Sequence, residues 1–313
     1  GLPDWNLVEV AGGNAASQVF ATRNGTDLAT LTVPGIYSFE GFWGYFFDQL
    51  DVVGEQLRKD QWVLGEQASS TDIDRRLQRL DRDLMERYRR EYIAAWNGML
   101  GNLTLVSMVA DKPQYAALGA ASSASGSPIM RLVESVDRET YLTREIEDAA
   151  NIPEEELASA MSGGGGSGGA VANQLLNRFI SRTGGMQRIL LEEANRKRGK
   201  TQIRPGESSS ASGSGPEVGI FAPIEAIAEE FSGWHALLQG TENARPIDTL
   251  LGDLGAIWMN RRDAESNPGP ADAALPTLLN TLTRNNSRLP ESLAAMMTRA
   301  EGDFRAGASD SSI

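Results

Sequence analysis

The sequence predicts a mainly α-helical protein: an elongated multi-helix bundle with a small N-terminal β-hairpin or extended segment. From Ser38 onward, apolar residues recur at spacings of three or four, which is the period of an amphipathic helix. Before Ser38, short runs of β-forming residues alternate with Gly12-Gly13 and Asn24-Gly25. An Asn-Gly pair between apolar runs is a hairpin signal. We therefore expect residues 5–36 to be extended, with a hairpin turn at Asn24-Gly25.

The apolar period is clearest from Thr71 to Leu103, where it continues without a break and predicts one long helix. A helix capped by Ser38 is expected before it. The pattern of residues 217–239 alternates between steps of four and three, as in a heptad seam, and predicts a single helix. The remaining helices are expected at residues 113–124, 128–136, 139–150, 152–161, 170–182, 185–198, 247–263, 271–284 and 289–305.

Two stretches rich in glycine and serine predict the domain organisation. Residues 162–169 read as a flexible linker, either natural or an engineered loop replacement. A second spacer, which we expect to be disordered, lies near residues 205–216. The predicted parts are a segment at 1–36 packed on the helices, a helical subdomain at 37–161, the linker, and a helical subdomain at 170–313 that contains the second spacer.

Composition excludes several classes of function. The chain has 313 residues, a formal net charge of −13 and no cysteine. The missing cysteines exclude disulfide and thiolate chemistry, and the acidic balance argues against a nucleic acid or an anionic membrane as partner. No apolar run is long enough to span a membrane, so we expect no direct membrane contact by this segment. Because the chain opens Gly1-Leu2, we interpret it as a fragment of a longer protein.

Residues that could carry chemistry have plainer explanations, and we predict no catalytic, cofactor-binding or metal-binding residue. Gly163, Gly165 and Gly168 have the spacing of a dinucleotide fingerprint, but a helical pattern precedes them where a strand is required. Gly199-Lys200-Thr201 resembles the end of a P-loop that lacks its first glycine. His235 is the only histidine, and its apolar surroundings favour packing. Carboxylate pairs lie on polar helix faces, where solvation explains them.

The aromatic residues are densest between Tyr37 and Phe47. They predict a core where the N-terminal segment meets the helices. An exposed patch for a partner protein remains a second interpretation, because seven aromatic residues within eleven cannot all face one way on a helix. The cluster comprises Tyr37, Phe39, Phe42, Trp43, Tyr45, Phe46 and Phe47.

Four short motifs follow one another along the first half of the chain. A Pro-Gly turn leads into an aromatic segment, a Trp-Val-Leu-Gly exit follows, then a Tyr-x-x-x-Trp segment, then a Ser-Pro step with a threonine beyond it. In this order and spacing they resemble the IcmF/TssM/VasK family, the inner-membrane core protein of type VI secretion systems. The residues, which we interpret as fold determinants, are Pro34, Gly35, Tyr37, Gly41, Phe42, Trp62, Val63, Leu64, Gly65, Tyr92, Trp96, Ser127, Pro128 and Thr140.

The resemblance implies that the chain is the helical middle part of a periplasmic region in an inner-membrane-anchored bacterial protein. It implies a non-catalytic scaffold within an envelope-spanning membrane complex, without a cofactor. The partners implied are proteins: further copies of the parent, an inner-membrane partner and an outer-membrane lipoprotein, the last two reached through the parent protein. The membrane anchors, the nucleotide-binding domain and the β-rich C-terminal part of the family are not among these residues.

Two other classes of function stay open at this point. A periplasmic ligand- or peptide-binding helical module would show a ligand-dependent rise in melting temperature. A periplasmic enzyme acting on the cell wall would need a concave pocket holding a carboxylate of raised pKa.

Overall fold

The computed structural model describes residues 1–47, 49–50, 52, 70–144, 147 and 221–309. The chain divides into two compact units. The predicted linker at 162–169, the spacer at 205–216 and the helices expected at 152–161, 170–182 and 185–198 lie outside the described residues, so the division predicted there stays a prediction. The first unit comprises Gly1–Phe39, Arg90–Tyr141 and Glu229–Ile313, and the second comprises Glu40–Arg89 and Leu142–Ala228.

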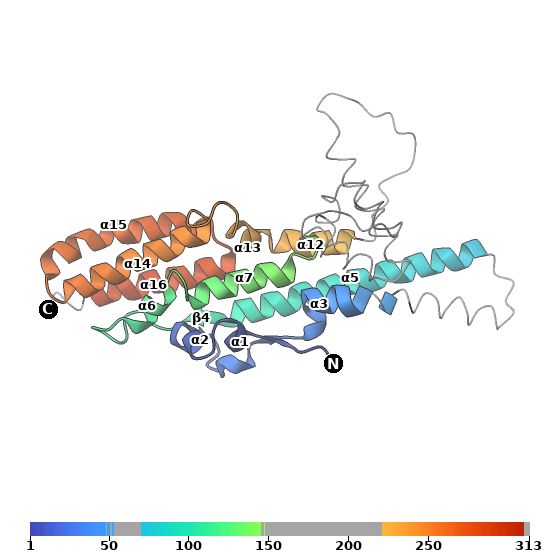
Figure 1. Cartoon of the computed structure of the whole chain (residues 1–313), viewed down its shortest axis with the longest axis horizontal. Coiled ribbons are helices and arrows are strands. Elements are labelled where there is room, and N and C mark those ends of the chain that lie inside the picture. The colour runs from blue at the N-terminus through green and yellow to red at the C-terminus, as the bar shows by residue number, and fades with distance from the viewer. Residues whose placement is uncertain (48, 51, 53–69, 145–146, 148–220, 310–313) are drawn as a thin grey trace, which may run out of the picture. The chain divides into compact units, whose positions relative to one another are not determined.

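The N-terminal residues mix short strands with short helices (Figure 1). Strand β1 pairs with β3 in antiparallel fashion, with Trp5 opposite Val33. Strand β2 pairs with β4, which follows the long helix α5, and Phe20 lies opposite Leu105. The elements are β1 (Trp5–Asn6), α1 (Leu7–Val10), α2 (Asn14–Val19), β2 (Phe20–Thr22), the 3-10 turn η1 (Leu28–Thr30), β3 (Thr32–Val33) and β4 (Leu103–Leu105).

The small N-terminal β element is confirmed, but two details of the prediction are wrong. Residues 5–36 are not extended throughout, because the Asn6 side chain caps α1 by accepting hydrogen bonds from the N–H groups of Val8 and Glu9. Asn24-Gly25 does not join two paired strands, since β2 pairs with β4 instead. Pairing with β4 buries both Phe20 and Leu105, and this tertiary packing overrides the local turn signal.

Helices dominate the rest of the described chain, as the sequence predicts. The long helix α5 begins at Ser70 and ends at Asn102. It is preceded by the 3-10 turn η2 (Gly35–Tyr37), α3 (Phe39–Gly41) and the π-helical turn η3 (Phe42–Phe46). It is followed by β4 and then by α6 (Ala116–Ala121) and α7 (Pro128–Thr140).

The C-terminal helices agree with the sequence except at one break. The helix expected at 217–239 is divided at Phe231 into α12 (Ala222–Glu230) and α13 (Ser232–Ala236). Ser232-Gly233 has low helix propensity, and this weakens the helix at the break. Three longer helices follow: α14 (Pro246–Ala264), α15 (Pro268–Asn286) and α16 (Glu291–Ser309).

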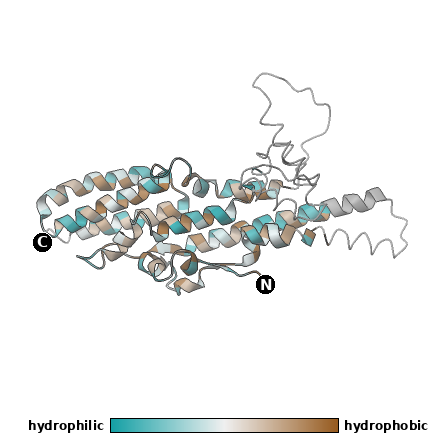
Figure 2. Cartoon of the chain, in the orientation of Figure 1, coloured by the Kyte–Doolittle hydropathy of each residue, from teal (hydrophilic) through white to brown (hydrophobic). Residues whose placement is uncertain are grey.

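The helices α14, α15 and α16 lie side by side in the first unit (Figure 1). Each carries an apolar stripe, and hydrophobic and hydrophilic residues alternate along these ribbons in Figure 2. Leu254, Leu279 and Met296 are among the side chains that the three helices bury. Among the described residues, no helix combines the length and the apolar character needed to cross a membrane.

Candidate functional site

Four aromatic residues join the N-terminal segment to helix α5, and we call Trp5, Tyr37, Tyr92 and Trp96 the aromatic junction. The rings of Trp5 and Trp96 lie 5.1 Å apart between centroids, and those of Tyr37 and Tyr92 lie 6.1 Å apart. Trp96 is fully buried, and its Nε1 donates a hydrogen bond of 2.8 Å to the carbonyl oxygen of Tyr37. The junction therefore combines ring packing with a directed hydrogen bond.

Two other polar tips of the junction reach helix α7, whereas the Tyr37 hydroxyl donates to Glu91 Oε2 of α5 at 2.8 Å. Trp5 Nε1 donates to Ser135 Oγ at 2.8 Å, and the Tyr92 hydroxyl donates to the carbonyl oxygen of Glu139 at 2.7 Å. Buried indole and phenol groups are stable only when such partners exist. The same Glu139 accepts a hydrogen bond from the Phe39 N–H at 3.0 Å. The junction thus ties together three segments that are distant in the sequence.

The Pro34-Gly35 turn sets the position of the chain's first residues. Gly35 is buried, and a Cβ atom there would collide with the carbonyl oxygen of Pro3. Its N–H donates to Asp4 Oδ1 at 3.0 Å. Pro34 itself is exposed. A glycine is required at residue 35 because two stretches of backbone approach each other there.

The Ser127-Pro128 motif starts helix α7. Ser127 Oγ accepts hydrogen bonds from the N–H groups of Ile129 and Met130, and it donates to the carbonyl oxygen of Ala121 at 2.6 Å. Pro128 occupies the first helical turn, where its missing N–H costs nothing. At the other end of α7, buried Thr140 donates to the carbonyl oxygen of Val136 at 2.7 Å. These residues define both ends of α7.

The remaining motif residues belong to the second unit. Gly41 is buried, and the fully buried Phe42 packs on Trp43, Phe47 and Tyr88 with ring centroids 4.8, 5.6 and 5.5 Å away. Three of the seven residues of the aromatic cluster, Phe42, Trp43 and Phe47, are buried core. The other four are half-buried, except Tyr45, which is 52% exposed. The Trp-Val-Leu-Gly motif, Trp62, Val63, Leu64 and Gly65, lies outside the described residues.

The comparisons with known proteins agree with the motifs. Residues 1–141 match the family model described as "IcmF-related: Intracellular multiplication and human macrophage-killing". This stretch belongs to the IcmF-related family. The match confirms the family resemblance, and all fourteen motif residues fall within it. No curated protein and no solved structure matches the chain.

His235 pairs with a residue of the IcmF-related stretch. It is 7% exposed, its Nδ1 lies 2.9 Å from Asp137 Oδ1, and its ring stacks on Tyr141 with centroids 4.8 Å apart. The His-Asp geometry is that of a hydrolase dyad, but the Nε2 atom is buried and hydrogen-bonds to no hydroxyl among the described residues. The arrangement favours a structural role. No pattern in the sequence marks Asp137 as the partner of His235, since 98 residues separate the two.

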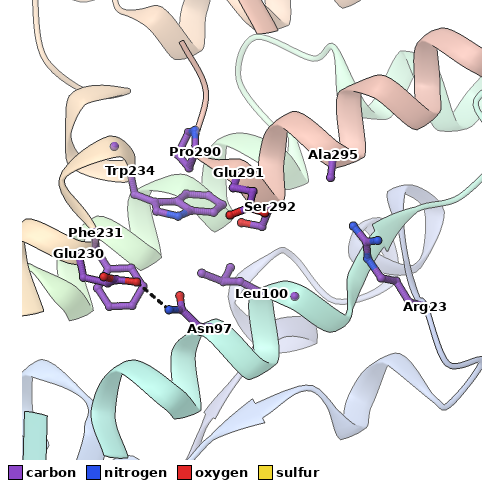
Figure 3. Close-up of a pocket in the computed structure, with 12 residues that line it drawn as sticks. Arg23, Asn97, Leu100, Glu230, Phe231, Trp234, Pro290, Glu291, Ser292 and Ala295 are labelled. Atoms are coloured by element: carbon purple, nitrogen blue, oxygen red, sulfur yellow. Dashed lines mark hydrogen bonds between the residues drawn. The ribbon is translucent and has the colours of Figure 1, made fainter. Parts of the chain in front are cut away.

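One groove of the first unit lies between the C-terminal turns of α5, the break between α12 and α13, and the start of α16 (Figure 3). We call it the Trp234 groove. Its volume is about 570 Å³. Asn97 Nδ2 donates to Glu230 Oε1 at 2.9 Å across one end, and Arg23 lies at the other end. Sequence reasoning missed this groove, since no motif marks any of its residues.

A second groove of about 690 Å³ lies between α6 and α14. The Arg245 guanidinium binds Asp248 through two hydrogen bonds of 2.9 Å at its edge. The hydrogen bond from Arg245 holds the pKa of the Asp248 carboxyl below its usual range, even though partial burial acts in the opposite direction. Because each charge already has a partner, this pair acts as a helix cap.

The remaining residues that could carry chemistry are possible metal ligands, Tyr115 and two glycine-containing motifs. Within the described part of the chain, no three His, Cys, Asp or Glu side chains are grouped so that they could hold a metal ion. Tyr115 has a raised pKa because burial and the neighbouring Glu265 carboxylate disfavour the phenolate. Its hydroxyl donates to Glu265 Oε1 at 3.2 Å, which links the start of α6 to the end of α14. The glycine fingerprint and Gly199-Lys200-Thr201 lie outside the described residues.

Proposed function

We propose that this chain is a non-catalytic structural scaffold, the periplasmic segment of the envelope-spanning membrane core complex of a type VI secretion system. The IcmF-related family points to a component of a secretion system, and the match covers residues 1–141. The scaffold role and the periplasmic location are the further steps of this proposal.

The observation that carries the scaffold role is how the described motif residues are used. Tyr92, Trp96 and Ser127 all direct their polar atoms to the backbone of other segments. None of the described motif residues lines either groove. The described motif residues thus hold elements of the fold in register, and this use of them supports a structural role for the segment.

The complex can be tested by purifying the tagged full-length parent protein from bacterial membranes. We expect an inner-membrane partner and an outer-membrane lipoprotein to copurify with it. As a control, the parent carrying Trp96→Ala should lose both partners if the folded first unit is needed for assembly. Recovery of the wild-type parent alone, in more than one detergent and at more than one salt concentration, would contradict the proposal.

The location can be tested separately, because these residues contain no cysteine. Met259 is 62% exposed, so Met259→Cys in the parent should react with a membrane-impermeant maleimide once the outer membrane is permeabilised. Met297 is fully buried, so Met297→Cys should react only after denaturation. Labelling of Met259→Cys that appears only after the inner membrane is lysed would place the segment in the cytoplasm and exclude the periplasmic proposal.

A further inference from the structure

The sequence holds two Asn-Gly pairs, Asn24-Gly25 and Asn97-Gly98, and the fold places them in different settings. In such a pair the backbone nitrogen of the glycine can attack the side-chain amide carbon of the asparagine, because glycine has no Cβ atom to hinder the approach. Asn24-Gly25 lies in an exposed turn between β2 and η1, whereas Asn97-Gly98 lies inside α5. The two pairs share the same chemistry, so the backbone around each pair decides whether it can react.

The turn at Asn24-Gly25 leaves the attacking nitrogen open. Gly25 is exposed, its φ is +74°, and a Cβ atom added there would meet nothing within 4 Å. Its N–H reaches the carbonyl oxygen of Thr22 only at 3.4 Å, which is beyond the usual range of a hydrogen bond. An N–H group held so weakly can lose its proton to hydroxide, and the deprotonated nitrogen is the nucleophile. The turn therefore supplies a nucleophile with little hindrance.

Thr26 holds the group that would be attacked. Its N–H and its Oγ1 both donate to Asn24 Oδ1, at 3.1 and 2.8 Å. Attack at Asn24 Cγ moves negative charge onto Oδ1, and two donors that point at this oxygen stabilise the charge. Thr22 Oγ1 donates to the carbonyl oxygen of Thr26 at 2.6 Å and so holds Thr26 in position. The turn thus forms a small oxyanion hole around the Asn24 amide.

Helix α5 holds the second pair in an unreactive geometry. Within a helix, the N–H of Gly98 donates to the carbonyl oxygen four residues earlier, so its proton is not free to leave. The helical ψ angle of Asn97 also keeps the side-chain amide from swinging onto the next nitrogen. In addition, Asn97 Nδ2 donates to Glu230 Oε1 at 2.9 Å. We expect no reaction at Asn97 while α5 is folded.

We propose that Asn24 is a site of spontaneous deamidation in the folded protein. Hydroxide takes the proton of the Gly25 nitrogen, this nitrogen bonds to Asn24 Cγ, and the side-chain amide nitrogen leaves as ammonia with a proton from water. Water then opens the resulting succinimide at one of its two carbonyl carbons, which gives aspartate or isoaspartate at residue 24. The inference goes beyond the proposed function and does not rest on it.

The product changes the charge and the backbone at the end of β2. Deamidation adds one carboxylate to a chain whose formal net charge is −13, and it does so next to Arg23. Isoaspartate also inserts an extra carbon atom into the backbone. Arg23 lies where this change is felt, because its N–H donates to the carbonyl oxygen of Asn102 at 2.8 Å and its Nε to that of Leu103 at 3.3 Å. The isoaspartyl group is the substrate class of S-adenosylmethionine-dependent isoaspartyl methyltransferases.

The test incubates the whole chain at physiological temperature and follows both Asn-Gly pairs by peptide mass mapping. Conversion of the amide to a carboxyl group changes the peptide mass, and methylation by an added isoaspartyl methyltransferase identifies isoaspartate. We expect deamidation at Asn24 and none at Asn97, with a rate that rises with pH because hydroxide generates the nucleophile. In urea Asn97 should react as well, whereas Asn24 should react at least as fast in the folded chain as in urea.

Three variants test the turn itself. Asn24→Gln should abolish the reaction at residue 24, since the longer side chain must close a larger ring. Thr26→Val removes the Oγ1 donor and keeps the N–H, so it should slow deamidation of Asn24 about three- to tenfold, less than for a buried oxyanion hole because water reaches the turn. Thr32→Val, at an exposed threonine of β3, should leave the rate unchanged. Circular dichroism spectra of all three variants should match the wild type.

Three outcomes would overturn the proposal. Equal rates at Asn24 and Asn97 in the folded chain would mean that the turn confers no reactivity. A rate at Asn24 that rises in urea would mean that the folded turn protects the amide. A rate that Thr26→Val leaves unchanged would mean that Thr26 only shapes the turn. None of these outcomes bears on copurification of the parent protein, so the two proposals can fail independently.

Discussion

The aromatic junction and the three C-terminal helices hold the first unit together in different ways. In the junction, single polar tips cross between segments that are far apart in sequence, as in the Trp5–Ser135 hydrogen bond, which spans 130 residues. In α14–α16, successive helices pack through repeated aliphatic side chains such as Leu254 and Leu279. Many apolar residues can replace one another in such an interface, whereas a directed hydrogen bond demands one residue type. The four motifs of the sequence all lie within residues 34–140, where the directed contacts of the junction are found.

Trp96→Ala is the change expected to break the junction most severely. The substitution leaves a large cavity and removes the donor to Tyr37 O, so it should lower the free energy of unfolding by about 3–5 kcal/mol. Trp96→Phe keeps most of the ring and should cost about 1–3 kcal/mol, chiefly through the unpaired carbonyl. Denaturant unfolding followed by circular dichroism measures both. Equal effects of the two variants would mean that the hydrogen bond, and not ring packing, dominates.

Gly35→Ala tests the close approach beside the junction. The new Cβ would collide with the backbone of Pro3, so we expect a loss of about 1–3 kcal/mol as the N-terminal segment shifts. Gly98 is the matched control, because it lies within α5 and a Cβ atom added there would meet no other residue. Gly98→Ala should stabilise the protein by about 0.5–1 kcal/mol through helix propensity. The same denaturation assay applies, and stabilisation by both changes would exclude the tight contact.

Asn260→Ala tests whether the C-terminal helices also depend on a directed contact. Asn260 is buried, donates to the carbonyl oxygen of Ala271 at 2.9 Å, and accepts hydrogen bonds from Arg261. Its removal should cost about 1–3 kcal/mol, because buried polar groups lose their partners. Asn280→Ala, at an exposed position of α15, should change the free energy of unfolding by less than about 0.5 kcal/mol. If both variants unfold like the wild type, α14 and α15 are held by apolar packing alone.

The smallest loss in the free energy of unfolding is expected for Asp248→Asn. The hydrogen bond from Arg245 lowers the folded-state pKa of the Asp248 carboxyl. A lowered pKa contributes stability above the unfolded-state pKa, and this contribution disappears as the pH falls through the folded-state pKa. At neutral pH, Asp248→Asn should cost at most about 1 kcal/mol, because the pair is only partly buried. Unfolding of both proteins at neutral and strongly acidic pH measures this cost. A difference that stays constant down to strongly acidic pH would contradict the assigned cause.

Helices can be predicted well from the sequence, whereas contacts between residues that are distant in the sequence cannot. The helices α5, α14, α15 and α16 agree with their expected ranges, because an apolar stripe fixes a helix without reference to the rest of the chain. The break at Phe231 was missed, since the Ser232-Gly233 step only weakens the helix and the pattern continues through it.

The candidate sites show the same limit. The motif residues Tyr37 and Trp96 are predicted to be fold determinants, but the sequence does not predict the hydrogen bond between them, since 59 residues separate them. The pairing of β2 with β4 and of His235 with Asp137 likewise depends on tertiary contacts alone. The Trp234 groove is assembled from four separate stretches of chain, none of which carries a distinguishing pattern.

The long reach of the N-terminal contacts has a consequence for the order in which the chain can fold. Strand β2 can pair with β4 only after Leu105 has been synthesised, and the Trp5 indole can donate to Ser135 only after Ser135 has been synthesised. During synthesis, residues 5–33 of this segment therefore emerge before their native contacts can form. Side chains that the fold buries, such as Phe20, stay exposed until then. Non-local pairing of this kind slows folding and prolongs exposure to aggregation and proteolysis. The stretch from Trp5 to Val33 is thus a part of this segment that depends on late-made residues to bury its apolar side chains.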